Sequence, residues 1–145
     1  MSSAIDQFLS VLRLTKHRIE YLTEADYKMI LDQSTLMTFA RHQVLIQRGK
    51  LSKMVYLVLS GKVTIEGFSE KIAQIGPGEV IGEMAFLESS LPSATAVAET
   101  DVEAFGIEYG TLSELFERHS DLASHFYKSV AVNLSRRLRE LIKPR

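Results

Sequence analysis

The sequence predicts a mainly β domain, built as a sandwich or barrel, with helices at both ends. Residues 36–108 hold seven of the eight glycines and two of the three prolines. Short apolar runs alternate there with turn signals at roughly 8–12-residue spacing, which is typical of sandwiches and barrels. Residues 1–35 contain neither glycine nor proline, and residues 109–145 return to helical spacing. Because 145 residues is the length of one domain, we expect these three segments to form a single unit.

Two or three short helices are expected before residue 36. Apolar residues recur at helical spacing at Ile5, Phe8, Leu9 and Leu12, and again at Tyr27, Ile30 and Leu31. Thr23 is followed by Glu24 and Asp26, which is typical of a capped helix start with acid in its first turn.

Six short strands can be placed within the central segment, at 44–46, 54–59, 62–65, 71–75, 95–98 and 102–107. The run at 54–59 is rich in β-branched and aromatic residues and predicts a buried strand. The run at 62–65 alternates polar and apolar residues, as a half-buried strand does. Glycines at 49, 61, 76 and 78 mark the turns between the strands.

The C-terminal segment predicts a short helix marked by Leu112, Leu115 and Phe116, and a longer one capped by Asp121 that ends near Ile142. The longer helix carries an apolar stripe, made of Phe126, Tyr127, Val130, Leu134, Leu138 and Leu141. Its basic end suits a helix C-terminus, with Arg136, Arg137, Arg139, Lys143 and Arg145.

Composition argues against several kinds of protein. The net charge is −1, whereas nucleic-acid binders are usually strongly basic. The chain has no cysteine, which excludes disulfides and thiolate metal sites. No apolar run reaches the ~20 residues of a membrane span, and the N-terminus lacks the pattern of a signal peptide. We therefore expect a cytoplasmic chain that binds neither membrane nor, within residues 1–145, nucleic acid.

Enzyme and metal chemistry find no support in the sequence. The four histidines do not pair at metal-ligand spacing; they are His17, His42, His119 and His125. The chain contains no P-loop and no nucleophile elbow. We therefore expect no metal site and no catalytic residues.

The segment 82–95 has the features of a pocket for an anion. Gly82 allows the backbone to approach a ligand closely, and the good helix formers at 83–87 predict a short helix directly after it. The first amides of a helix have no internal partners and favour a phosphate. Glu83, in the first turn, is placed to accept hydrogen bonds from a ligand hydroxyl such as that of a ribose.

Over about residues 20–142 the chain resembles the cyclic nucleotide-binding domain family. Residues 47–49 and 56–63 resemble that family's first strands, residues 75–87 its phosphate-binding cassette, and residues 93–98 the strand after it. The resemblance implies an antiparallel double-stranded β-helix (a jelly-roll-like β-roll) of eight strands. It also implies cAMP or cGMP as a possible ligand, no other cofactor, and a C-terminal helix that covers the pocket as a lid. In the bacterial regulators this helix also pairs two subunits, so a homodimer or a partner protein is expected there.

The resemblance assigns the ligand-binding residues as well. Gly82 and Ala85 would offer amides to the cyclic phosphate, and Glu83 would bind the ribose 2′-hydroxyl. Ser93 and Ala94 would lie beside the phosphate and the base. The whole expected set is Gly82, Glu83, Met84, Ala85, Pro92, Ser93, Ala94 and Thr95.

One position departs from the family. The arginine expected just before the Ser-Ala-Thr run is replaced by Pro92 or, with the register shifted by one, by Ser93. An arginine binds phosphate bidentately, and hydrogen bonds to charged groups contribute about 1.5–3 kcal/mol each. Two hypotheses follow: a sensor with weakened affinity or an altered ligand, or a degenerate β-roll that serves dimerisation or protein contact without nucleotide. The candidates for a replacement cation are Arg41, Arg48, Lys62 and the basic residues of the lid helix.

Overall fold

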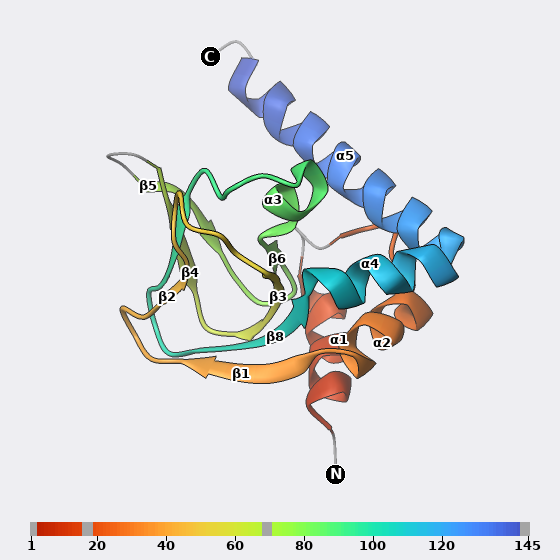
Figure 1. Ribbon diagram of the computed structural model, residues 1–145. Helices are drawn as coiled ribbons and strands as arrows, with labels where there is room; N and C mark the ends of the chain where they lie inside the picture. Colours follow the sequence, from red (N-terminus) through yellow and green to blue (C-terminus); the bar gives the residue numbers. More distant parts are fainter. Residues whose placement is uncertain (1–2, 16–18, 68–70, 143–145) are drawn as a thin grey trace.

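The computed structural model describes residues 3–15, 19–67 and 71–142, and Figure 1 shows a β-roll with its helices gathered on one side. Two four-stranded sheets make the roll, in the orders β1-β8-β3-β6 and β2-β7-β4-β5. Every strand pair is antiparallel. The predicted β-roll is therefore confirmed. The strands are β1 Thr35–Phe39, β2 Val44–Ile46, β3 Met54–Ser60, β4 Val63–Glu66, β5 Lys71–Ile75, β6 Val80–Ile81, β7 Thr95–Ala98 and β8 Val102–Glu108.

Six of these strands lie where the sequence pattern predicts them, within a residue or so at each end. The pattern does not reveal β1 and β6. β6 is only two residues long, which is too short for any periodicity. The residues of β1 are mostly exposed until Phe39. Its sequence therefore shows no alternation of apolar and polar residues that would mark a half-buried strand.

The helices before the roll are α1 Ala4–Leu14 and α2 Glu24–Asp32. Thr23 caps α2 as predicted, and Asp26 completes a capping box with it. After the roll come α4 Tyr109–Arg118 and α5 Ser120–Ile142. The predicted Asp121 cap is wrong: the amide of Ala123 donates to the carbonyl of His119 at 3.2 Å, so helical hydrogen bonding already includes Asp121 in its first turn.

Strand β3 separates two hydrophobic cores. Val55, Leu57 and Leu59 point into a core shared with the helices, whereas Tyr56 and Val58 point into the interior of the roll. A strand that is buried on both faces reads as a continuous apolar run. This explains why residues 54–59 have no alternation in the sequence.

The apolar stripe of α5 is only partly buried. Phe126 and Val130 are 2% and 7% exposed, whereas Leu138 and Leu141 are 59% and 83% exposed. In Figure 1 the C-terminal half of α5 extends beyond the rest of the molecule. The stripe therefore packs against the core through its first half.

Candidate functional site

A pocket opens between the roll and α5, at the short helix α3 Glu83–Glu88. One wall is made of α3 and the loop that follows it, and the floor comes from inward-facing residues of the sheets. α5 and the segment before α2 contribute one residue each. The lining residues are Ile19, Ile46, Ile65, Ile75, Glu79, Val80, Ile81, Gly82, Glu83, Met84, Ala85, Glu88, Ser90, Leu91, Pro92, Ser93, Ala94, Ala96 and Asn133.

Gly82 fixes the start of α3, as the sequence predicts. Its backbone is left-handed, with φ +90°, and it occupies the N-cap position of the helix. A Cβ at this position would lie 2.9 Å from Ile46 Cδ1 and 3.0 Å from the carbonyl oxygen of Met54. Glycine is therefore required twice, for its φ angle and for the close approach to the neighbouring strands.

The turn before the cassette is held by one contact within the turn and one to strand β3. Gly78 has φ +86°, and its amide donates to the carbonyl of Val58 at 2.8 Å. The carboxylate of Glu79 accepts a hydrogen bond from the Gly76 amide at 2.9 Å. Glu79 therefore lines the pocket and stabilises the turn at the same time.

The loop after α3 forms the opposite rim. Pro92 is buried, and its carbonyl accepts a hydrogen bond from the Gly49 amide at 2.9 Å. Ser93 lines the pocket but is exposed. Of the eight residues that the sequence assigns to the ligand, seven line the pocket. Thr95 lies outside the lining, where its Oγ1 accepts a hydrogen bond from the Arg48 amide at 3.0 Å.

Sequence reasoning did not find the contributions of Asn133 and Ile19. Asn133 follows Phe126 by seven residues and Val130 by three, so it falls on the apolar stripe of α5. A polar residue within that stripe is the signal that marks it. Through Asn133, α5 borders the pocket, which is the position expected for a lid helix.

The charge around the pocket is one-sided. Its described lining includes Glu79, Glu83 and Glu88 but no lysine, arginine or histidine. The candidate cations Arg41, Arg48 and Lys62 lie outside this lining. On α5, the guanidinium of Arg136 forms an ion pair with Glu20. Within the described lining, an anionic ligand would therefore depend on neutral donors, which are backbone amides and the side chains of Ser90, Ser93 and Asn133.

No group of three or more acidic or histidine side chains in the described part of the chain could hold a metal ion. His17 lies outside the described residues. Within residues 3–15, 19–67 and 71–142, no helix is both long enough and apolar enough to cross a membrane.

A β-roll with a glycine-started helix and a helical lid at its pocket defines a class of ligand-binding domain. The chain matches the protein-family model of the cyclic nucleotide-binding domain over residues 36–119, more than half of its length. The chain therefore belongs to the cyclic nucleotide-binding domain family.

Curated relatives agree with this assignment. The chain is 29% identical to the cyclic GMP-binding protein C of Dictyostelium discoideum over 83% of its length, and 38% identical to the cyclic AMP receptor protein of Thermus thermophilus over 64%. It spans only 5% and 44% of those two proteins. The crystal structure of the Thermus thermophilus catabolite activator protein superposes with a TM-score of 0.71 at 28% identity, covering 87% of this chain and 60% of that one.

Proposed function

We propose that this chain is a non-catalytic regulatory module that binds a cyclic nucleotide with weakened affinity, or an altered ligand, in the pocket beside α3. The module works in the cytoplasm and needs no cofactor besides that ligand. Relatives named for cyclic GMP and cyclic AMP support the ligand class. The expected binding residues are Gly82, Glu83, Met84, Ala85, Pro92, Ser93, Ala94 and Thr95.

The pocket wall at α3 carries this proposal. Gly82 is left-handed and starts a helix whose first residues, Glu83 and Ala85 among them, line the pocket. Ser93 and Ala94 line it from the loop on the opposite rim. Amides at a helix start favour a phosphate, and a carboxylate accepts hydrogen bonds from ribose hydroxyls.

The absence of a cation from the described lining supports the weakened affinity. Two lost hydrogen bonds to a charged phosphate, at about 1.5–3 kcal/mol each, lower the affinity by roughly two orders of magnitude or more. Glu79 and Glu88 in the lining act in the same direction, because carboxylates repel an anion.

Ligand binding would act by population shift. A ligand that contacts both α3 and α5 stabilises the arrangement in which the two helices lie together over the pocket. It moves the equilibrium only by its difference in affinity for the two arrangements. Calorimetry with cAMP, cGMP and cyclic dinucleotides at millimolar concentration is the test. An absence of both heat and thermal shift would remove the proposal.

Ser93→Arg restores the missing charge at an exposed position of the pocket lining. We expect it to raise the affinity for cyclic mononucleotides by roughly a hundredfold, from two charge-assisted hydrogen bonds. Pro92→Arg is the register control, and it is less favourable because Pro92 is buried. Ser124→Arg adds the same charge at an exposed site outside the lining. If neither Ser93→Arg nor Pro92→Arg binds, the pocket does not take the family's ligand.

The exposed half of α5 favours a second function, in which the domain serves as a dimerisation or protein-contact module. Leu134, Leu138 and Leu141 expose 39%, 59% and 83% of their surface at the spacing of a two-helix interface. Sedimentation of the parent and of Leu138→Arg distinguishes the two functions. A dimer that the substitution dissociates supports this alternative, and a monomer at high concentration rejects it as a homodimer.

A further inference from the structure

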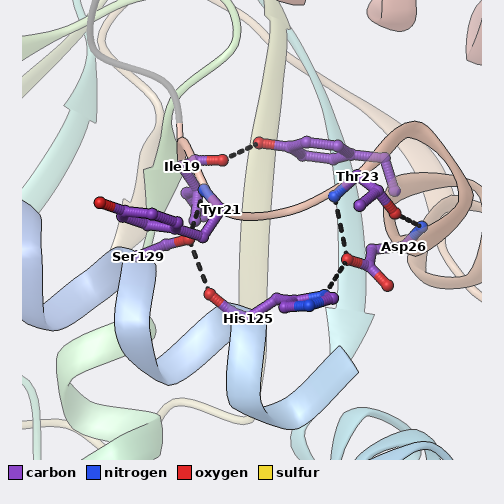
Figure 2. Close-up of polar contacts among 7 residues, drawn as sticks. Ile19, Tyr21, Thr23, Asp26, His125 and Ser129 are labelled. Atoms are coloured by element: carbon purple, nitrogen blue, oxygen red, sulfur yellow. Dashed lines mark hydrogen bonds and ion pairs between the residues drawn. The ribbon is translucent and has the colours of Figure 1, made fainter. Parts of the chain in front are cut away.

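The lid helix α5 is contacted by the chain segment 19–26, which we call the clasp. The clasp precedes and begins α2, and it meets α5 through side chains and amides at four points. Figure 2 shows the two central contacts, where His125 and Ser129 of α5 face Asp26 and Tyr21 of the clasp. All four join residues about a hundred or more positions apart in the sequence.

The first contact is a hydrogen-bonded pair with a buried carboxyl group. Asp26 Oδ2 lies 2.7 Å from His125 Nδ1, and the Asp26 residue is only 4% exposed. The same oxygen accepts a hydrogen bond from the Thr23 amide at 2.9 Å. The 2.7 Å separation of the two atoms is that of a hydrogen bond between the imidazole and the carboxyl group. A buried carboxylate needs such partners, and α5 supplies one of them.

The second contact passes through a buried hydroxyl. Ser129 is 3% exposed, and its Oγ accepts a hydrogen bond from the Tyr21 amide at 2.9 Å. The hydroxyl donates in turn to the carbonyl of His125 at 2.7 Å. The serine therefore uses both of its hydrogen-bonding roles to join the clasp to the helix backbone (Figure 2).

Two outer contacts extend the clasp along the helix. Lys128 Nζ lies 4.4 Å above the centre of the Tyr21 ring, within the range of a cation–π interaction. Arg136 pairs with Glu20. The hydrogen bond from Arg136 to Glu20, and then the charge of Glu20, raise the pKa of the Arg136 guanidinium above its ordinary value. Both partners are partly exposed, so this outer pair contributes less than the buried contacts.

The spacing of these contacts brings the clasp to the pocket. His125, Ser129 and Arg136 lie on one face of α5, because they are four and seven residues apart. Asn133 falls on the same face, between Ser129 and Arg136, and it lines the pocket. At the other end, the clasp begins with Ile19, which lines the pocket as well.

We propose that the clasp fixes α5 over the pocket, and that Asp26, acting through His125, together with Ser129 positions Asn133 in the pocket wall. This inference rests on the proposed function in naming that pocket as the ligand site. Asp26, His125 and Ser129 are then positioning residues, which act on a ligand only through Asn133 and Ile19.

A single cysteine makes the position of the lid measurable. The chain has no cysteine, so Asn133→Cys provides one thiol in the pocket wall. Asn133 is half-buried, so the rate of reaction with a maleimide reports how strongly the position of α5 shields the thiol. In this background His125→Ala removes the inner contact but keeps the capping box of Thr23 and Asp26. We expect the thiol to react about three to ten times faster, as the loss of one partly exposed charge-assisted hydrogen bond predicts.

Two matched variants separate positioning from stability. Thr23→Ala removes the side-chain cap of α2 and lowers stability, yet it leaves the Asp26–His125 pair, so the thiol should react at the parent rate. His125→Asn places an amide N–H near the position of Nδ1 and should restore the slow rate. The His125 side chain is 39% exposed, so its replacement does not disturb the core. Arg136→Gln removes the outer pair with Glu20, and we expect it to accelerate the thiol reaction by a smaller factor.

Parent rates in His125→Ala and Arg136→Gln would overturn the proposal, and so would equal acceleration by Thr23→Ala and His125→Ala. The thiol readout needs no ligand. A chain that binds no nucleotide in calorimetry but shows the expected rates would therefore lose its proposed function and keep its clasp. A chain that binds a nucleotide in calorimetry but shows parent rates in His125→Ala and Arg136→Gln would keep its proposed function and lose the clasp.

Discussion

The two sides of the pocket are held in place in different ways. The cassette side combines contacts within a few residues, such as the Gly76 amide to the Glu79 carboxylate, with contacts to other parts of the roll, such as the Gly78 amide to the Val58 carbonyl. The lid side is set by contacts across 99 residues, from Asp26 to His125, and 108 residues, from Tyr21 to Ser129. The cassette is therefore held within the β-roll, whereas the lid depends on contacts between α5 and the segment 19–26.

A substitution in the buried first half of α5 should have the largest effect on stability. Phe126 is 2% exposed and packs against Phe86 of α3 and Phe116 of α4, with ring centroids at 6.5 and 5.1 Å. Phe126→Ala should lower the free energy of unfolding by about 3–5 kcal/mol, the usual cost of emptying such a site. Chemical denaturation measures this change.

The matched control lies on the same helix. Leu138 is 59% exposed, so Leu138→Ala should change the free energy of unfolding of the monomer by no more than about 0.5 kcal/mol. Similar losses in the two variants would mean that the outer half of α5 packs as tightly as the inner half, and the contrast between them would be withdrawn.

On the cassette side, a substitution of Gly82 should be the most disruptive. In Gly82→Ala the left-handed backbone alone costs about 1–3 kcal/mol, and the new Cβ also meets Met54 O at 3.0 Å. Because the cassette is held within the β-roll and α5 is held by the clasp, hydrogen exchange should speed up in α3 and stay unchanged in α5.

Two other glycines divide the Gly82→Ala effect into its parts. Gly49 has φ +77° with no atom within 4 Å of a built Cβ, so Gly49→Ala reports the backbone cost alone. Gly110 lies in α4 with open space around it, so Gly110→Ala should be neutral or stabilise by up to about 1 kcal/mol. Equal losses at Gly82 and Gly49 would show that the close approach to β3 adds no cost.

The same contrast explains which features the sequence could predict. The turn at Gly76 and Gly78, the helix after Gly82 and the Thr23 cap each depend on residues that are neighbours in the chain, and each was predicted correctly. Asn133 and Ile19 enter the pocket only because the clasp brings α5 to it. No local pattern contains a contact across a hundred residues, so the polar Asn133 within an apolar stripe was the only trace of it.

A smaller effect, at high pH, tests the packing of β3 beside the start of the cassette helix. Tyr56 on β3 is 6% exposed and pairs with Ile81, the residue before Gly82. Burial, and then the neighbouring Tyr109, raise the pKa of the Tyr56 phenol above its ordinary 10.0. The folded chain therefore keeps this proton to higher pH than the unfolded chain, and stability falls as the pH rises above about 10. In Tyr56→Phe the free energy of unfolding should fall less steeply over this range. Tyr127→Phe changes an exposed tyrosine, so its stability should depend on pH as that of the parent does. Parallel curves of unfolding free energy against pH for all three proteins would mean that the Tyr56 phenol is solvated.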